Sequence, residues 1–397
     1  MKKKYIILSL LIGLSLGLEV HAKEEAKSVN LNQGNNVQTK TAPISPDLQS
    51  FLDKESKQLS TEFPYRLNLF KNGHIDENKA GLRISEVAKQ FGDLGLSGQL
   101  FYYKLFDHSM RVPHWHANAI EVGVVLNGKM KVTLWEGSGK PKIFTVEKNG
   151  TWLIPKAALH ALENVGKEEL NFIVTYNSPD AADRDFATAW AALPDDILSR
   201  SLGLSPDEVT TVKKSTVNRL SKEDPFSVPE EAIIPSSLAG NFSSVKPLYK
   251  SALGSIRRID EKTNPAMQFM ALQQTLLNPG TIREPHWYTG ADTLLFVNKG
   301  KALFIMMNDE GKTYKALVNR GDLIFIPIGT FHTYVNVGSE ILEIYESFNN
   351  SKELSEVSLL KGTQTFHPGT IASATGLELE AAEKILKKEG HNYMVEF

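Results

Sequence analysis

Residues 111–116, Arg-Val-Pro-His-Trp-His, recur 172 positions later as Arg-Glu-Pro-His-Trp-Tyr at 283–288. The correspondence keeps one offset across residues 111–164, and eight of eleven paired positions are identical, which independent loops would not achieve by chance. A fixed offset of this kind indicates an internally duplicated chain. The other pairs at this offset are Glu121 and Thr293, Gly128 and Gly300, Pro155 and Pro327, His160 and His332, and Asn164 and Asn336.

The composition narrows the classes of partner. Of the 397 residues, 23% are charged, and the net charge is −2 with both signs interspersed, so no basic surface for nucleic acid is expected. The absence of cysteine excludes thiolate zinc sites, catalytic thiols and disulfides. Any bound metal must therefore take nitrogen and oxygen ligands. We expect a small-molecule partner, and the sequence leaves a homo-oligomer open.

Residues 1–22 have the three parts of a signal peptide: three lysines at 2–4, an apolar run over 5–18, and Val20 and Ala22 at the positions that signal peptidase reads. The alternative is an uncleaved anchor, but the apolar run is shorter than the roughly 20 residues that span a bilayer. We expect cleavage near Ala22, a periplasmic or secreted protein, and no stable membrane insertion after cleavage.

The rest of the chain alternates between strand-rich and helical stretches. Polar residues followed by apolar ones at helical spacing predict a flexible leader and a short helix in 23–61. Short apolar runs separated by turn residues predict antiparallel strands in 62–178 and again in 223–347. Helical spacing predicts a helical lid or linker in 179–222 and a C-terminal helical segment in 348–397.

The first copy carries a complete set of metal-binding side chains. His114 and His116 lie two apart on a predicted strand and therefore point to the same face. A lone His-X-His pair is more often structural, but here Glu121 and His160 join it at fixed spacings. Three imidazoles and one carboxylate suit manganese, iron, nickel, cobalt or zinc, and an octahedral ion would keep two open positions for a substrate.

The second copy has lost part of this set. Tyr288 replaces the second histidine and Thr293 replaces the glutamate, which leaves only His286 and His332. Two donors are too few for a tight site. We therefore expect one working metal site, in the first copy, and an empty second site.

The combined spacing resembles the double motif of the cupins, His-X-His-(X)4-Glu-(X)6-Gly followed by Gly-(X)4-Pro-(X)4-His-(X)3-Asn. Two departures concern turns: His108 stands where the motif has a glycine, present as Gly280 in the second copy, and Gly321 lies one residue further from its proline than Gly150 does. The resemblance implies an all-β fold, a double-stranded β-helix (cupin) barrel duplicated in tandem (bicupin), with short helical appendages after each barrel.

Among cupins the chain resembles two-domain oxalate decarboxylases over roughly residues 60–385, since they carry Arg-Glu-X-His-Trp-His and Asn-Ala-Asp-Glu where this chain has 111–116 and 118–121. The resemblance implies Mn2+ as the metal, Arg111 as the residue that binds the substrate carboxylate, and a lid glutamate that handles the proton. Residues 180–185 contain no glutamate, so Asp183 or Asp185 would have to substitute. The alternative for these aspartates is helix capping ahead of Phe186.

The leader and the metal-binding set predict an exported, metal-dependent protein, and the resemblance implies a bicupin that converts oxalate to formate and carbon dioxide in its first domain. The alternatives are another cupin oxidase or dioxygenase acting on a small acid or enol, and a non-enzymatic bicupin that binds metal or a small ligand. Trp115 and Trp287 point away from the ligand face and are predicted to pack in the core. Arg111 is out of register with the histidines, but a bend at Pro113 could turn it inward.

Overall fold

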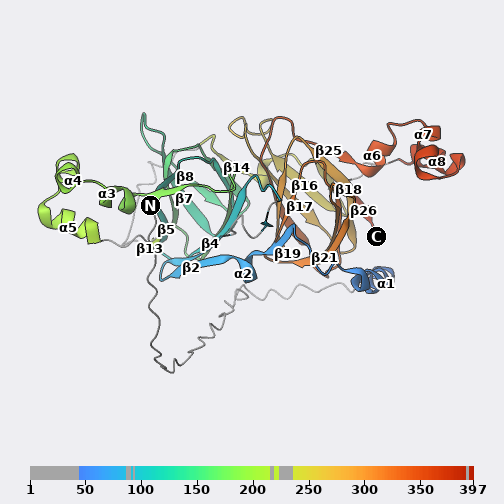
Figure 1. Cartoon of the computed structure of the whole chain (residues 1–397), viewed down its shortest axis with the longest axis horizontal. Coiled ribbons are helices and arrows are strands. Elements are labelled where there is room, and N and C mark those ends of the chain that lie inside the picture. The colour runs from blue at the N-terminus through green and yellow to red at the C-terminus, as the bar shows by residue number, and fades with distance from the viewer. Residues whose placement is uncertain (1–43, 86–90, 93, 215–218, 223–235, 390–392) are drawn as a thin grey trace, which may run out of the picture. The chain divides into compact units, whose positions relative to one another are not determined.

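The computed structural model describes residues 44–85, 91–92, 94–214, 219–222, 236–389 and 393–397. The expected signal peptide and the leader up to residue 43 lie outside these ranges. Within them, no helix is both long and apolar enough to cross a membrane. The described residues form two strand-rich barrels, each followed by helices, so the expected duplicated fold is confirmed (Figure 1).

Barrel one consists of two antiparallel sheets, with the strand orders β14-β9-β6-β11-β4-β3-β2 and β12-β5-β10-β7-β8, and β13 pairs with β5. On β7, Met130, Val132 and Leu134 are fully buried, as the two-residue period of a strand requires. The strands are β2 (His74–Asn78), β3 (Gly81–Ser85), β4 (Gln99–Leu105), β5 (Ser109–His116), β6 (Glu121–Asn127), β7 (Lys129–Trp135), β8 (Lys142–Glu147), β9 (Gly150–Ile154), β10 (Leu159–Asn164), β11 (Leu170–Tyr176), β12 (Asp183–Asp185), β13 (Leu220–Lys222) and β14 (Ala239–Asn241).

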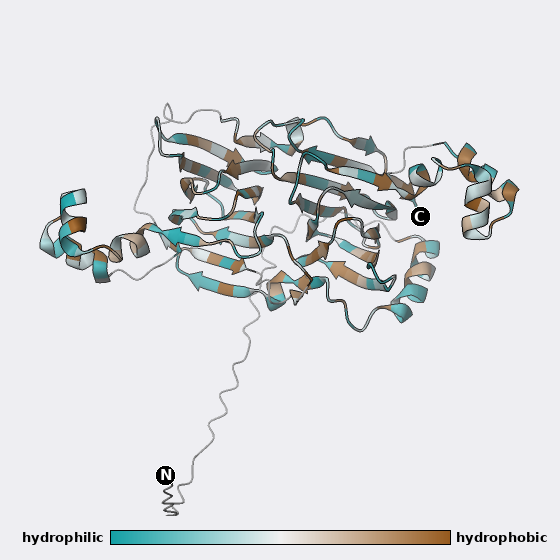
Figure 2. Cartoon of the chain, turned by 45° about the horizontal axis from the view of Figure 1, so that its top comes forward, coloured by the Kyte–Doolittle hydropathy of each residue, from teal (hydrophilic) through white to brown (hydrophobic). Residues whose placement is uncertain are grey.

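Barrel two repeats this plan with the orders β1-β22-β19-β24-β17-β16-β15 and β21-β20-β23-β18-β25, and β26 pairs with β18. Apolar and polar residues are interspersed along the strands of both barrels (Figure 2). The strands are β1 (Arg66–Asn68), β15 (Tyr249–Ser251), β16 (Gly254–Ile259), β17 (Ala271–Leu277), β18 (Thr281–Thr289), β19 (Thr293–Lys299), β20 (Lys301–Met307), β21 (Thr313–Asn319), β22 (Asp322–Ile326), β23 (Phe331–Asn336), β24 (Leu342–Phe348), β25 (Ser355–Ser358) and β26 (Met394–Glu396).

Except for α2, which lies in a segment predicted to be strands, the helices lie in the segments where the spacing predicted them, and those segments also contain the short strands β12, β13, β25 and β26. Pro46 begins α1, whose Leu48 packs against Leu303 and Val335 on barrel two. Gly203 ends α4 in the left-handed conformation, with φ 72°. The helices are α1 (Pro46–Glu55), α2 (Leu69–Asn72), α3 (Phe186–Ala191), α4 (Asp195–Leu202), α5 (Pro206–Lys214), α6 (Leu359–Thr363), α7 (Pro368–Thr375) and α8 (Leu379–Lys387), with 3-10 turns η1 (Ser56–Gln58) and η4 (Phe242–Ser244).

The barrels exchange strands, so the linear boundaries expected from the sequence do not coincide with them. Strand β1 precedes barrel one in the chain but pairs with β22 of barrel two, where Arg66 donates two hydrogen bonds to the buried carboxylate of Asp322, at 3.0 and 3.1 Å. Conversely, β13 and β14 pair with β5 and β9 of barrel one. Such pairings join residues far apart in sequence, and no local pattern reports them.

Both barrels contain the same β-bulge at the same proline. On β5, His114 pairs with His160 and Arg111 with Leu162, so three residues of β5 advance against two of β10. The extra residue turns Arg111 to the buried side, as the bend at Pro113 predicted. Barrel two repeats the shift between β18 and β23.

The two departures from the cupin motif have a conformational explanation. His108 adopts φ 50° and its counterpart Gly280 adopts φ 73°, so the turn keeps its left-handed residue in both copies. Gly321 has φ 90°, and the residue 172 positions earlier, Asn149, has φ 65°. Asparagine is one of the residues that tolerates this conformation, which explains why the glycine of the second copy stands one position earlier than Gly150.

Candidate metal centre

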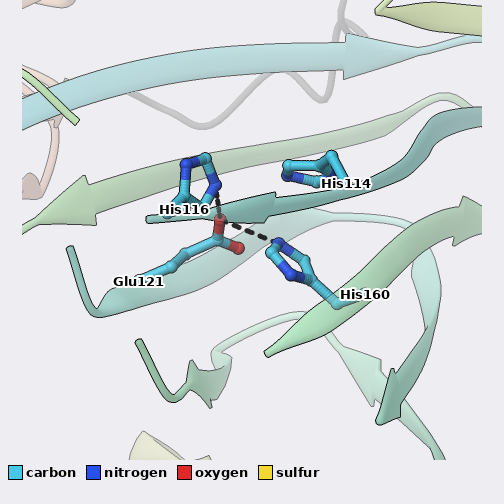
Figure 3. Close-up of side chains that lie close together, drawn as sticks. All are labelled: His114, His116, Glu121 and His160. Carbon is cyan, nitrogen blue, oxygen red and sulfur yellow. Dashed lines mark hydrogen bonds and ion pairs between the residues drawn. The ribbon is translucent and has the colours of Figure 1, made fainter. Parts of the chain in front are cut away.

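The four predicted donors of barrel one converge inside it (Figure 3). His114 and His116 come from β5, Glu121 begins β6 and His160 lies on β10. Each is at most 3% exposed. One ligand atom from each lies within 4.8 Å of all the others, so the strand pairings bring the sequence-predicted set together.

The donor spacing fits a single ion. The Glu121 Oε2 atom lies 3.1 Å from His116 Nε2 and 3.3 Å from His160 Nε2. Two ligands at right angles on an ion, each about 2.1 Å from it, would lie about 3 Å apart. The ring centroid of His114 lies 4.0 Å from that of His160. The residues therefore fit a divalent transition metal with nitrogen and oxygen donors.

Backbone carbonyls fix the orientation of two of the imidazoles. Nδ1 of His114 lies 2.7 Å from the Val112 oxygen, and Nδ1 of His160 lies 2.9 Å from the Ala158 oxygen. A proton held at Nδ1 leaves Nε2 as the donor atom, which is the usual arrangement of metal-bound histidine.

Trp152 holds the glutamate, and the sequence analysis did not predict this role. Its buried indole N–H, on β9, donates to Glu121 Oε1 at 2.9 Å, while Oε2 faces His116 and His160. The corresponding residue of barrel two is Ile324, so the repeat carried no signal for this contact.

The surroundings favour the protonation states that bind metal. Burial would raise the pKa of Glu121, but His160 and His116 hold it well below its ordinary value, so the group is a carboxylate. Burial lowers the pKa of His114 well below its ordinary value, and the positive charge of Arg111 lowers it further. A neutral imidazole beside an ionised carboxylate is the state that coordinates a cation.

Arg111 lies beside the metal donors, paired with an aspartate of the predicted lid. Its Nη2 donates to both oxygens of Asp183 at 2.6 Å. Arg219 donates a further hydrogen bond to Asp183 at 3.1 Å. Burial would raise the pKa of Asp183, but Arg111 and other neighbouring positive charges hold it below its ordinary value. Strand β12 pairs Asp183 with His116, which places the ion pair at the donor strand.

Asp185 caps α3, as the alternative interpretation of this residue expects. One of its oxygens accepts from the Thr188 N–H at 3.0 Å and the other from the Thr188 hydroxyl at 3.1 Å. These bonds cap α3. Trp115 is half-buried and lies between His114 and His116 on β5, so its side chain points to the face of the strand opposite the metal donors.

Barrel two holds more donors than the sequence analysis counted. His286 and His332 are fully buried, and Tyr288 and Thr293 occupy the positions expected from the repeat. A third candidate donor, Glu346 on β24, has one ligand atom within 4.8 Å of those of both histidines. Its counterpart in barrel one is Val174, and this apolar-to-acidic change at the repeat offset is the signal that could have revealed it.

Comparison with known proteins agrees with this geometry. A family model described as Cupin matches residues 67–210 and 240–382. Oxalate decarboxylase OxdC of Bacillus subtilis is 21% identical over 260 residues, 63% of this chain and 66% of that protein. An oxalate decarboxylase of Arthroderma benhamiae is 21% identical over 309 residues, 70% of this chain and 72% of that protein. The structure of Lactobacillus farciminis oxalate decarboxylase with formate has a TM-score of 0.72 at 19% identity and covers 82% of this chain and 97% of that chain, a likeness of fold.

Proposed function

The chain belongs to the cupin family, as a bicupin similar to oxalate decarboxylases, and we propose that it converts oxalate to formate and carbon dioxide at the metal centre of barrel one. The observation that carries this proposal is the complete, converging set of His114, His116, Glu121 and His160 beside the buried cation Arg111. Manganese is the metal we propose, and iron, nickel, cobalt and zinc are the alternatives that the same donors accept.

The reaction needs two kinds of help from the protein. Oxalate takes up one proton and loses its C–C bond, whose electron pair ends in the C–H bond of formate. A bound divalent ion would supply the positive charge that binds one carboxylate. Arg111 would bind the other through charge-assisted hydrogen bonds.

Asp183 is the candidate proton carrier, because it bonds Arg111, whereas the hydrogen bonds of Asp185 cap α3. While Arg111 holds it, Asp183 has a lowered pKa and is a poor acid. A substrate carboxylate that competes for the Arg111 guanidinium would release Asp183, which would keep its hydrogen bond from the partly exposed Arg219. The pKa of Asp183 would then rise toward its ordinary value, so substrate binding would itself prepare the acid.

Turnover by the manganese-loaded full chain tests the proposal. Formate production from oxalate should be detectable between mildly acidic and neutral pH, and Arg111→Ala should lower kcat/KM by about ten- to a hundredfold with unchanged metal content. Arg184→Ala is the matched control, because Arg184 is an exposed arginine on the same strand as Asp183. The proposal fails if oxalate yields no formate, and hydrogen peroxide without formate would indicate an oxidase instead.

A non-enzymatic bicupin is the second candidate, and one observation favours it. Arg111, the residue proposed to bind the substrate, is already bonded to Asp183 at 2.6 Å. Residues 180–185 also contain no glutamate that could act as the proton carrier. A protein of this kind would bind metal or a small carboxylate without turnover. Metal content near one ion in barrel one, with no product from a panel of small dicarboxylates, would favour it. An oxidase or dioxygenase acting on another acid or enol would instead consume oxygen.

The cellular setting of the proposal rests on residues 1–22. We propose that the chain is exported to the periplasm or secreted after cleavage near Ala22, and that it then has no stable membrane insertion. Intact-mass measurement of the exported protein tests this. A soluble form that retains Met1 would contradict it.

A further inference from the structure

The buried carboxylate of barrel two lies on the strand next to the one that carries the carboxylate of barrel one. Barrel one has Glu121 on β6 and Val174 on the adjacent β11, whereas barrel two has Thr293 on β19 and Glu346 on the adjacent β24. Thr293 and Glu346 are at most 1% exposed, so the carboxylate that barrel two lost at one strand has a buried counterpart at the next.

The two histidines of barrel two are held as the metal donors of barrel one are. His286 Nδ1 lies 2.7 Å from the backbone oxygen of Glu284, and His332 Nδ1 lies 2.9 Å from the backbone oxygen of Thr330. These are the same distances as at the equivalent positions of barrel one. Their ring centroids lie 4.1 Å apart. In both, Nε2 is buried and has no hydrogen-bond partner among the described residues. Buried acceptors of this kind are rarely left unmatched in proteins.

Glu346 is oriented by its neighbours and retains capacity for a further partner. The Tyr288 hydroxyl donates to Oε1 at 2.9 Å, and Gln273 and Thr275 donate to Oε2 at 2.6 and 3.1 Å. A carboxylate can accept about four such bonds, so one position remains after these three. Hydrogen bonds of this kind fix the ligand carboxylates of metal sites.

We propose that barrel two binds a divalent first-row transition metal ion through His286, His332 and Glu346. Two imidazoles and one carboxylate that converge from three strands form a two-histidine, one-carboxylate set, which suits iron, manganese, cobalt or zinc and leaves further positions open. The sequence analysis expected this site to be empty because it counted two donors, and Glu346 removes that reason. The set differs from that of barrel one, since a tyrosine and a threonine stand where two of its donors were.

The electrostatics of the barrel agree with this assignment. Burial raises the pKa of Glu346 even though Arg283 and three hydrogen bonds act to lower it. Arg283 is the neighbouring cation that lowers this pKa most, and it is itself paired with Glu356 at 2.7 Å. A divalent ion between Glu346 and the two histidines would supply further positive charge.

Metal stoichiometry of the full chain tests the proposal without any substitution. Protein stripped with a chelator and then dialysed against Co2+ should bind two ions per chain, and His332→Ala should reduce this to one. Saturation of the unmutated protein at one ion per chain would overturn the proposal. The measurement does not depend on turnover, so it is separate from the test of oxalate decarboxylation in barrel one.

A carboxylate variant identifies the third ligand. In a background with His114→Ala and His160→Ala, which removes two donors of barrel one, Co2+ should still bind at one ion per chain. Glu346→Gln should weaken this binding by about a hundredfold or more, because it removes a direct ligand. Glu343→Gln, the same change on the same strand, is the matched control and should leave the affinity unchanged.

Equal affinities of the Glu346→Gln and Glu343→Gln variants would refute the ligand assignment. If the background variant does not fold, the same two substitutions in the unmutated chain give the answer through stoichiometry. The visible absorption of bound Co2+ depends on its ligands, so Glu346→Gln should also change the spectrum of any Co2+ that still binds in barrel two.

Discussion

Trp152→Phe should weaken metal binding in barrel one while leaving all four ligands in place. The substitution keeps a buried aromatic ring on β9 but removes the N–H that donates to Glu121 Oε1 at 2.9 Å. Glu121 would then be held in position only by His116 and His160, the groups with which it would share the ion. Its carboxylate would have more freedom to rotate away from the metal.

The expected magnitude follows from the role of such contacts. Loss of a hydrogen bond that orients a metal ligand typically lowers affinity ten- to a hundredfold. This corresponds to about 1.4–2.7 kcal/mol. The smaller ring also loses packing against Phe172, whose centroid lies 5.6 Å away. That packing loss is common to the metal-free and metal-bound forms, so it should lower the melting temperature of both and largely cancel from the affinity.

A competition titration measures the effect. Chelator-stripped protein carrying His332→Ala, which removes a donor of barrel two, would be titrated with Mn2+ against a metal-responsive dye. Trp135→Phe is the matched control, because the Trp135 N–H donates to the Gly139 oxygen at 3.2 Å on the surface. Equal Kd values for the Trp152 and Trp135 variants would refute the reasoning.

Three further predictions follow from the lid and the N-terminus. Asp185→Ala removes the cap of α3 and should lower the free energy of unfolding by about 0.5–2 kcal/mol, with metal content unchanged by elemental analysis. Because Arg111 holds the pKa of Asp183 below its ordinary value, despite the opposing effect of burial, this carboxylate stabilises the fold fully above about pH 4 and loses that contribution as pH falls through its native pKa. Denaturant titration should therefore find that the stability difference between wild type and Asp183→Asn shrinks below pH 4. Exported protein should have the intact mass of a chain that begins just after Ala22.

The parts of the centre that could be predicted from sequence are those with local signatures. The pair His114 and His116 follows from strand alternation, and Pro113 marked the bulge that turns Arg111 inward. Trp152 and Glu346 were not predicted, because neither belongs to the repeated motif that marked His160, and each reaches its centre from a strand whose place is set by long-range pairing. The exchanged strands β1 and β14 were misassigned for the same reason.

The lid aspartates show where a family pattern and local physics diverge. The resemblance asked for an acid between residues 180 and 185, and both Asp183 and Asp185 satisfied it in sequence. An aspartate directly before a helix is also one of the favoured N-cap residues, and this is the role of Asp185. The pairing of β12 with β5 places Asp183 opposite His116 and Asp185 opposite His114, so their hydrogen bonds separate the two: Asp183 accepts from Arg111, whereas Asp185 accepts from Thr188.

The arginine–acid pair occurs in both barrels, and this bears on its role. Arg283 Nη2 donates to Glu356 at 2.7 Å, and its Nη1 donates to the backbone oxygen of Tyr393 at 3.0 Å. In the same way, Arg111 donates to Asp183 and to the backbone oxygen of Arg219.

Barrel two keeps this pair although it has lost two of the donors found in barrel one. The pair therefore has a structural role in both barrels: it joins β12 to β5 in barrel one and β25 to β18 in barrel two. Breaking either pair should therefore destabilise the fold, by less than the roughly 3–5 kcal/mol of a fully uncompensated buried charge, because Asp183 keeps Arg219 at 3.1 Å and Glu356 keeps Arg258 at 3.9 Å. Arg111→Ala and Arg283→Ala should lower stability alike in denaturant titrations, whereas only Arg111→Ala should reduce oxalate turnover. An equal loss of turnover in both variants would assign Arg111 a structural role alone.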